Sequence, residues 1–240
     1  MTGDRIFGNV TALIELLAHH DALTVNTTAE RLGIPRATAH RIVAGLVEAA
    51  MATFDDDGRV HLSTRWLHLA EASRRQKAEW EAAHEVLLDL SRSTGHSAYL
   101  IVPEDDHGLC IDWAPGHGIG VLELRPGGTL PLHAGAGGLV ILAFGTKDVE
   151  RHLESAPFPS LTSATVTGAG NLRAMVQDIR ARGYSISDED VTVGVYSLGV
   201  PVMRDGDFVG ALSLGGLKLR MLEQTDSLVD KLLGAARTLA

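Results

Sequence analysis

The sequence predicts an α+β protein in two parts, a small helical domain that ends in a β-hairpin and a larger domain built on one mostly antiparallel sheet. Apolar residues recur at helical spacing in the first 50 residues, and a hairpin pattern follows them. The stretch from 64 to 94 has neither proline nor glycine and is rich in helix formers, so it predicts a helical connector. Beyond it, short apolar runs separated by polar turns alternate with amphipathic segments, which is typical of a sheet covered by helices.

Three helices are expected in the first 50 residues. The first ends at the polar stretch HHD and has an apolar face of Ile6, Val10, Leu13, Ile14 and Leu17. Thr24 has the hydroxyl that caps a second helix, and Gly33 supplies the left-handed residue that ends it. Pro35 suits the first turn of a third helix, where its missing N–H costs nothing. The buried face of that helix is expected to consist of Ala39, Ile42, Val43, Leu46 and Val47.

The exposed start of the third helix carries basic and polar side chains. Arg36, Thr38, His40 and Arg41 face away from its apolar side. A helix N-terminus with arginines and a hydroxyl suits phosphates and base edges in a DNA major groove. Two helices joined by a short glycine turn form a helix-turn-helix, whose second helix reads DNA.

A wing follows in residues 51–63, MATFDDDGRVHLS. Two strands are expected around an Asp-Gly turn, with Phe54, Val60 and Leu62 on the apolar side. Arg59 lies just beyond the tip and is expected to reach a backbone phosphate. The run Asp55 to Asp57 repels phosphate, so this contact is predicted to be weak or shifted.

Composition restricts the function. The formal net charge is −9, yet residues 1–75 hold eight arginines against nine acids and are nearly neutral. Most of the negative charge therefore lies in residues 76–240, so only residues 1–75 suit binding to a polyanion. The single cysteine, Cys110, excludes an intramolecular disulfide and a cysteine zinc site. His19, His20, His61 and His68 lack a metal-like partner set. With no leader pattern and no membrane span, we expect a cytoplasmic protein without metal or cofactor.

The connector is expected to divide the chain. We predict a DNA-binding domain at 1–63, a linker helix at 64–78 and a rear domain at 79–240, with a joint in the polar stretch 73–79. Trp66, Leu69 and Ala70 are expected to pack on a second copy. The rear core is expected to begin with Ala83, Val86, Leu87 and Leu90, which recur at helical spacing.

The rear domain should alternate strands and helices. Paired strands are expected at 97–106 and 108–115, a strand and turn at 121–133, and a hairpin over Asp205-Gly206. Helices are expected after the glycine-rich segment HAGAGG at 133–138, at 171–183 before Gly183, and at the end of the chain. Free N–H groups at HAGAGG would suit a carboxylate, whereas neither a dinucleotide fingerprint nor a P-loop lysine is present.

Six segments, in order and at matching spacing, resemble the IclR (isocitrate lyase regulator) family of transcription factors over nearly the whole chain. They are ALIELLA, AERLGIPRATAHRIVAGL, DDDGRVHLSTRWLHLA, LPLHAGAGGLVILAF, DIRARGYSISDEDVTVGVYSLGVPV and GDFVGALSLGG. The resemblance implies a winged helix-turn-helix, a linker helix and a GAF-like effector-binding domain. It also implies a homodimer or dimer of dimers that responds to a small organic or aromatic acid, with repression the commoner outcome.

The resemblance also implies site residues. DNA contacts fall on Arg36, Thr38, His40 and Arg41, although Ala37 stands where a serine is commoner. The effector pocket falls on Ala136, Gly137, Ser197 and Ser213, with Asp188 as the acidic residue upstream. Leu139 stands where the family often has lysine, and Gly215 where it often has serine. These two departures predict a roomier, less polar pocket and a larger or aromatic ligand.

Two other functions stay open at this point. Ser197, His133 and Asp188 are the residue types of a hydrolytic triad, but Ser197 lies in a strand-like run without a nucleophile elbow. A pocket hydroxyl and a structural histidine are the favoured interpretation. The other alternative is a ligand sensor that binds a protein instead of DNA, which a flat salt dependence of DNA binding would favour.

Overall fold

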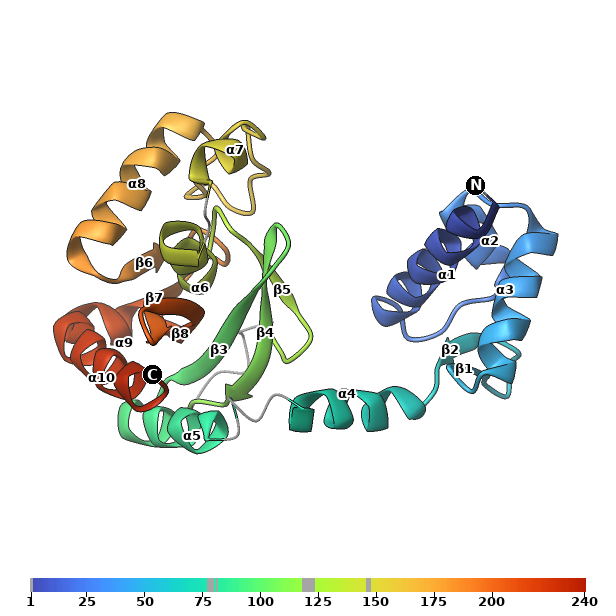
Figure 1. The fold of residues 1–240 in the computed structure, drawn as a ribbon, viewed down its shortest axis with the longest axis horizontal. Helices are drawn as coiled ribbons and strands as arrows, with labels where there is room; N and C mark the ends of the chain where they lie inside the picture. The colour runs from blue at the N-terminus through green and yellow to red at the C-terminus, as the bar shows by residue number, and fades with distance from the viewer. Residues whose placement is uncertain (1, 77–79, 81, 118–123, 146–147) are drawn as a thin grey trace. The chain divides into compact units, whose positions relative to one another are not determined.

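The chain forms two compact units, residues 1–78 and 79–240. The structure is a computed structural model that describes residues 2–76, 80, 82–117, 124–145 and 148–240 (Figure 1). The joint expected at 73–79 and the start of the strand expected at 121–133 lie partly outside the described residues. None of the helices in the described ranges is long and apolar enough to cross a membrane.

The front unit consists of helices and a short hairpin, as the sequence predicts. Its elements are α1 (Thr2–Ala18), α2 (Val25–Leu32), α3 (Arg36–Glu48), β1 (Ala52–Phe54), β2 (Val60–Leu62) and α4 (Arg65–Gln76). The predicted cap of α2 is confirmed, because the Thr24 hydroxyl accepts a hydrogen bond from the Thr27 N–H at 3.1 Å. Gly33 ends α2 with φ 62°, and Pro35 is the N-cap of α3, one residue before its first turn.

A small core joins these elements. The buried residues Leu13, Leu17, Ile42, Val43, Leu46, Ala52 and Val60 form it. Leu23 bonds to Val60 in both directions, at 3.0 and 2.8 Å, and so attaches the start of α2 to the wing. Phe54, expected on the buried side, is 46% exposed, because it is the last residue of a three-residue strand and lies next to the turn.

The rear unit has one sheet and several helices. Its elements are α5 (Ala83–Thr94), β3 (Ser97–Glu104), β4 (His107–Ala114), β5 (Thr129–Pro131), α6 (Ala136–Val140), the π-helix η2 (Ile141–Gly145), α7 (Val149–Leu153), α8 (Ala169–Arg182), β6 (Ser185–Asp188), β7 (Val195–Arg204), β8 (Asp207–Leu217), α9 (Lys218–Met221), the 3-10 helix η3 (Leu222–Gln224) and α10 (Thr225–Thr238). The short elements β6, α7 and α9 are additional to those predicted.

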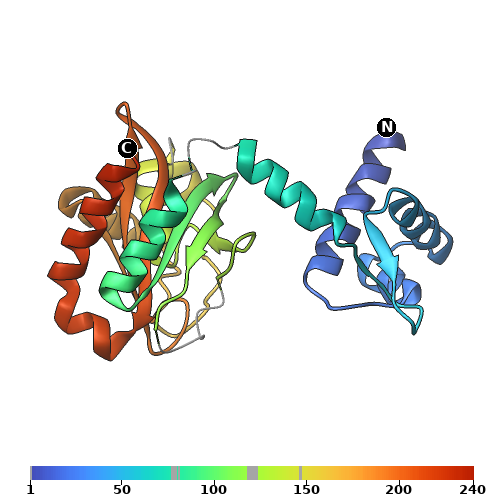
Figure 2. The ribbon, with the colours of Figure 1, turned by 90° about the horizontal axis from the view of Figure 1, so that it is seen from below.

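The sheet is antiparallel throughout, in the order β5-β4-β3-β8-β7-β6. This confirms the predicted α+β class and the hairpin at Asp205-Gly206, where φ is 52° and 89°. In the rear unit, α5 and α10 cover one face of the sheet, and α6 and α8 cover the other (Figures 1 and 2). Strand β3 serves both layers, since Leu100 faces the α5–α10 layer while Tyr99 and Ile101 face the other.

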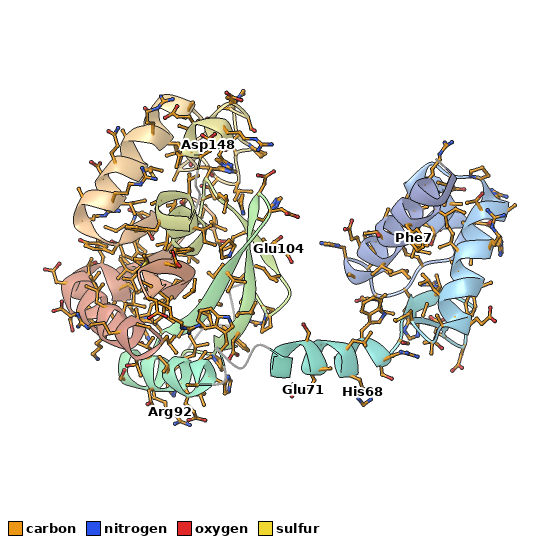
Figure 3. All side chains as sticks on the ribbon, viewed as in Figure 1. Phe7, His68, Glu71, Arg92, Glu104 and Asp148 are labelled. Atoms are coloured by element: carbon orange, nitrogen blue, oxygen red, sulfur yellow. The ribbon has the colours of Figure 1, made fainter. Side chains whose placement is uncertain are left out.

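Side chains project from the sheet and from the helices toward one another in both layers (Figure 3). The glycine-rich segment makes a close approach between α6 and β5. Gly135 has φ 75°, a conformation that favours glycine. A Cβ on Gly138 would lie 2.2 Å from the backbone oxygen of Pro131, so only glycine lets α6 pack this closely on β5. The start of α6 is therefore held against the sheet without an intervening side chain.

Candidate functional sites

The first candidate site is the exposed start of α3. Arg36, His40 and Arg41 are exposed and Thr38 is half-buried, while the opposite side of the helix lies in the core of the front unit. Arg36 lies 3.6 Å from Glu30, and both side chains are about two-thirds exposed. Exposed ion pairs of this kind contribute little, so the Arg36 guanidinium can exchange this contact for a phosphate or a base.

The tip of the wing is held by one of its acids. The Asp55 carboxylate accepts hydrogen bonds from the N–H groups of Asp57 and Arg59, at 3.0 and 2.8 Å. Asp56 and Asp57 are exposed, as is Arg59. Asp55 therefore holds the turn, and its carboxylate keeps its negative charge beside those of Asp56 and Asp57.

The second candidate site is a cavity of about 330 Å³ in the rear unit. Its volume lies within the range of roughly 300–1,000 Å³ typical of small-molecule sites. The lining consists of Tyr99, Leu124, Gly128, Thr129, Leu130, Pro131, Gly135, Ala136, Gly137, Leu161, Ser187, Val191, Thr192, Val195, Ser197, Ser213 and Gly215. Most of the side chains are apolar, several carry a hydroxyl, and none of these lining residues carries a charge.

The structure brings four of the five expected pocket residues together. Ala136, Gly137, Ser197 and Ser213 all line the cavity. Asp188 does not, because it is exposed and its carboxylate lies 2.7 Å from the Lys218 ammonium.

The two departures from the family pattern lie in different places. Gly215 lines the cavity, but Leu139 is fully buried in the core on α6 and is not among the lining residues. Leu139 therefore does not affect the polarity of the pocket, and only Gly215 still supports the expectation of a less polar pocket.

Strand register explains how distant residues meet at the cavity. Ser197 on β7 is paired with Ser187 on β6 and with Gly215 on β8. One row along, Ser213 on β8 is paired with Tyr99 on β3. Paired residues face the same side of a sheet, so these side chains form a hydroxyl-rich floor. The glycine-rich segment and the loop around Val191 close the cavity from above.

Asp190 is a site residue that sequence reasoning missed. Its side chain is 6% exposed, and its carboxylate accepts hydrogen bonds from the Ser187 hydroxyl and, at 3.2 Å, from the Gly135 N–H. Burial raises the pKa of Asp190, while these hydrogen bonds act in the opposite direction. The contact ties the loop after β6 to the glycine-rich segment. The Gly135 N–H, one of those expected to suit a ligand carboxylate, thus binds the chain's own Asp190. The acidic run DED at 188–190 gave no sequence signal that Asp190, and not Asp188, is the buried residue beside the cavity.

Lys218 holds the same loop from the other side. Its ammonium bonds to Asp188 at 2.7 Å and to Glu189 at 2.9 Å. The side-chain hydrogen bonds with these two carboxylates raise the pKa of Lys218, and the bond from Lys218 lowers the pKa of Glu189. Glu189 also accepts a hydrogen bond from the Gly194 N–H at 2.8 Å. The loop that closes the cavity is therefore anchored at both ends.

The geometry does not support the hydrolase alternative. His133 Nε2 bonds to the backbone oxygen of Pro159 at 2.9 Å, and its ring stacks on Phe158 with 4.9 Å between centroids. Neither His133 nor Asp188 lines the cavity with Ser197. The favoured interpretation of His133 as a structural histidine agrees with these contacts.

Metal binding has no geometric support within the described ranges either, since they contain no group of three His, Cys, Asp or Glu side chains arranged for a metal ion. His68, one of the four front histidines, projects from α4 (Figure 3) and is exposed.

Comparisons with known proteins agree in both units. Residues 9–56 match the model of the IclR helix-turn-helix domain, and residues 78–240 match that of the bacterial transcriptional regulator IclR C-terminal domain. The glycerol operon regulatory protein of Streptomyces griseus is 34% identical over 85% of this chain and 82% of its own length. The regulator BhcR of Paracoccus denitrificans is 27% identical over 99% of this chain and 87% of its own length.

A solved structure shares the fold over nearly the whole length. It is an IclR homologue from Microbacterium hydrocarbonoxydans in complex with 4-hydroxybenzoate, with a TM-score of 0.86 and 24% identity. The match covers 98% of this chain and 97% of that one.

Proposed function

Because the chain belongs to the IclR family of DNA-binding transcriptional regulators, we propose that it is a repressor whose affinity for operator DNA is controlled by a small organic or aromatic acid. The observation that carries the proposal is the cavity, which gathers Ala136, Gly137, Ser197 and Ser213 in one place of suitable size. The homologue that binds 4-hydroxybenzoate supports an aromatic acid as the effector. The protein acts in the cytoplasm.

Operator recognition is assigned to α3 and the wing. Arg36, Thr38, His40 and Arg41 enter the major groove, and Arg59 contacts a backbone phosphate. Exposure of the four charged or imidazole side chains supports this assignment. Arginines make both kinds of contact, since a guanidinium pairs with phosphate and with the acceptor edge of guanine.

A homodimer, alone or as a dimer of dimers, reads two half-sites. Exposed apolar side chains on the front unit support this, since Phe7 on α1 is 75% exposed (Figure 3) and Leu67 on α4 is 72% exposed. Leu69, expected at the interface, is 40% exposed. Trp66, also expected there, donates its indole N–H to the Met51 oxygen at 2.7 Å, so it attaches α4 to its own front unit. Leu67 therefore takes the place of Trp66, beside Leu69 and Ala70, among the apolar contacts of the proposed interface.

Regulation follows from differential binding. The effector prefers one arrangement of the rear domains, 79–240, and the linker helix, 64–78, transmits that preference to the spacing of the two recognition helices. The effector changes operator affinity only by as much as its own affinity differs between the two arrangements.

A gel-shift assay tests the proposal. The full-length protein is titrated on its own upstream intergenic DNA at two salt concentrations, with and without a panel of aromatic and aliphatic carboxylic acids. A specific shift that weakens steeply with salt and is released by one acid is expected. A shift that salt does not affect would refute operator binding through phosphate contacts, and a shift that every acid leaves unchanged would refute the effector class.

A further inference from the structure

A buried hydroxyl borders the cavity without a protein partner. Tyr99, on β3, is 4% exposed, and its hydroxyl makes no hydrogen bond with any residue in the described ranges. A buried polar group left unpaired costs stability, so such groups are rare in folded proteins. The side chain of Tyr99 also lines the cavity.

The surroundings keep this hydroxyl protonated and therefore a donor. Burial raises the pKa of Tyr99 to about 12, and Ser97, Trp113 and Arg125 only partly offset that effect. The Ser97 oxygen accepts a hydrogen bond from the Gly116 N–H at 3.0 Å. The buried indole N–H of Trp113 has no hydrogen-bond partner in the part of the chain that the structure describes.

Further hydroxyls and a positive charge surround Tyr99. Ser213 is paired with Tyr99 across β3 and β8, and like Ser197 it has no side-chain hydrogen bond within the described residues. The Arg125 guanidinium lies over the Trp113 ring, 4.2 Å from its centroid, and its charge favours negative charge at Tyr99. The end of the cavity at Tyr99 thus has the hydroxyl donors of Tyr99 and Ser213, with the Arg125 guanidinium nearby.

The remainder of the cavity wall suits a flat apolar body. Leu130, Leu161 and Val191 line it, and no lining side chain supplies a carboxylate or an ammonium group. Since none of the described residues that line the cavity is cationic, those residues hold an acid through neutral donors.

We propose that Tyr99 determines the specificity of the effector site: its hydroxyl, together with that of Ser213, donates a hydrogen bond to the carboxylate of a planar, largely apolar acid. This inference rests on the proposed function. It adds a residue that the family resemblance did not single out, and it identifies the end of the cavity at which the carboxylate binds.

The test compares Tyr99→Phe with the wild type by calorimetric titration of the full-length protein. The probes are benzoate, 4-hydroxybenzoate and benzylamine, which has a similar body but an ammonium in place of the carboxylate. The wild type should bind at least one acid and not benzylamine. Tyr99→Phe should bind that acid about tenfold to a hundredfold more weakly, since one hydrogen bond to a charged acceptor is lost.

Thermal unfolding without ligand separates recognition from a structural role. Tyr99→Phe should melt no lower than the wild type, because it removes a buried hydroxyl without a partner and leaves the ring in place. Tyr196→Phe is the matched control: Tyr196 lies in the opposite layer, its hydroxyl is 3.5 Å from that of Thr225, and its substitution should leave the acid affinity unchanged.

The possible outcomes are distinguishable. Unchanged acid affinity in Tyr99→Phe, equal loss in Tyr196→Phe, a melting temperature lowered by several degrees, or tight binding of benzylamine each overturns the inference and leaves operator binding intact. If the wild type binds none of the acids, both this inference and the effector part of the proposed function fail, while the gel shift still tests operator binding.

Discussion

The close approach of α6 to β5 predicts that Gly138→Ala destabilises the rear unit and its cavity. The added Cβ would lie 2.2 Å from the Pro131 oxygen and 3.2 Å from its carbonyl carbon. Backbone atoms cannot rotate away as a flexible side chain can, so α6 must move off β5. Pro131, Ala136 and Gly137 all line the cavity, so that movement also changes its shape.

The magnitude follows from two opposing effects. Overpacking a tight interior costs about 1–3 kcal/mol, and a contact with a backbone oxygen places this substitution near the upper end. Replacing glycine by alanine inside a helix returns about 0.5–1 kcal/mol. The net destabilisation is about 2 kcal/mol, which lowers the melting temperature of a domain of this size by roughly 4–8 °C.

Differential scanning calorimetry of the full chain measures this effect, with two controls. Gly234, in α10, has no atom within 4 Å of an added Cβ, so Gly234→Ala should stabilise the rear unit by about 0.5–1 kcal/mol. Gly45, in α3, is equally open, so Gly45→Ala identifies the transition of the front unit. A Gly138→Ala protein at least as stable as the wild type would refute the close approach.

Three further predictions concern charge and capping. Arg41→Ala should weaken binding to operator and random DNA alike and lower the salt dependence of the affinity by about one phosphate contact, a slope change of about 1. Arg36→Ala should cost about 1–3 kcal/mol of binding free energy on the operator alone. Gel shifts on both DNAs measure these losses, and equal losses of Arg36→Ala on the two DNAs would contradict a specific role for Arg36. Burial raises the pKa of Asp190 above its ordinary 3.8, so the folded state binds this proton more tightly than the unfolded chain. The contribution of Asp190 to the free energy of unfolding is fully present below pH 3.8 and declines as the pH rises through the folded-state pKa. Urea unfolding across that pH range should show a smaller decline in the free energy of unfolding for Asp190→Asn than for the wild type. Identical pH profiles of the two proteins would contradict this role of Asp190. Thr24→Ala should destabilise the front unit by about 1 kcal/mol through loss of the α2 cap, and an unchanged front transition in calorimetry would contradict that.

Features set by neighbours in the chain were predictable. The cap at Thr24, the left-handed Gly33 and the turn at Asp205-Gly206 depend on the backbone preferences of single residues and their nearest neighbours. Helical spacing likewise predicted the core face of α3, because a helix repeats its environment every three or four residues. Phe54 shows the limit of such reasoning, since alternation along a strand does not reveal where the covering helices end.

The cavity required strand pairing between distant segments. Ser187, Ser197 and Gly215 meet only because β6, β7 and β8 align in one register, and Tyr99 joins them through β3. Within the acidic run at 188–190, charge alone could not separate the exposed Asp188 from the buried Asp190; the direction of each side chain relative to the glycine-rich segment separates them. Local preferences therefore determine the helices, the turns and the exposed face of α3, whereas long-range packing decides which hydroxyls and carboxylates leave water and surround the cavity.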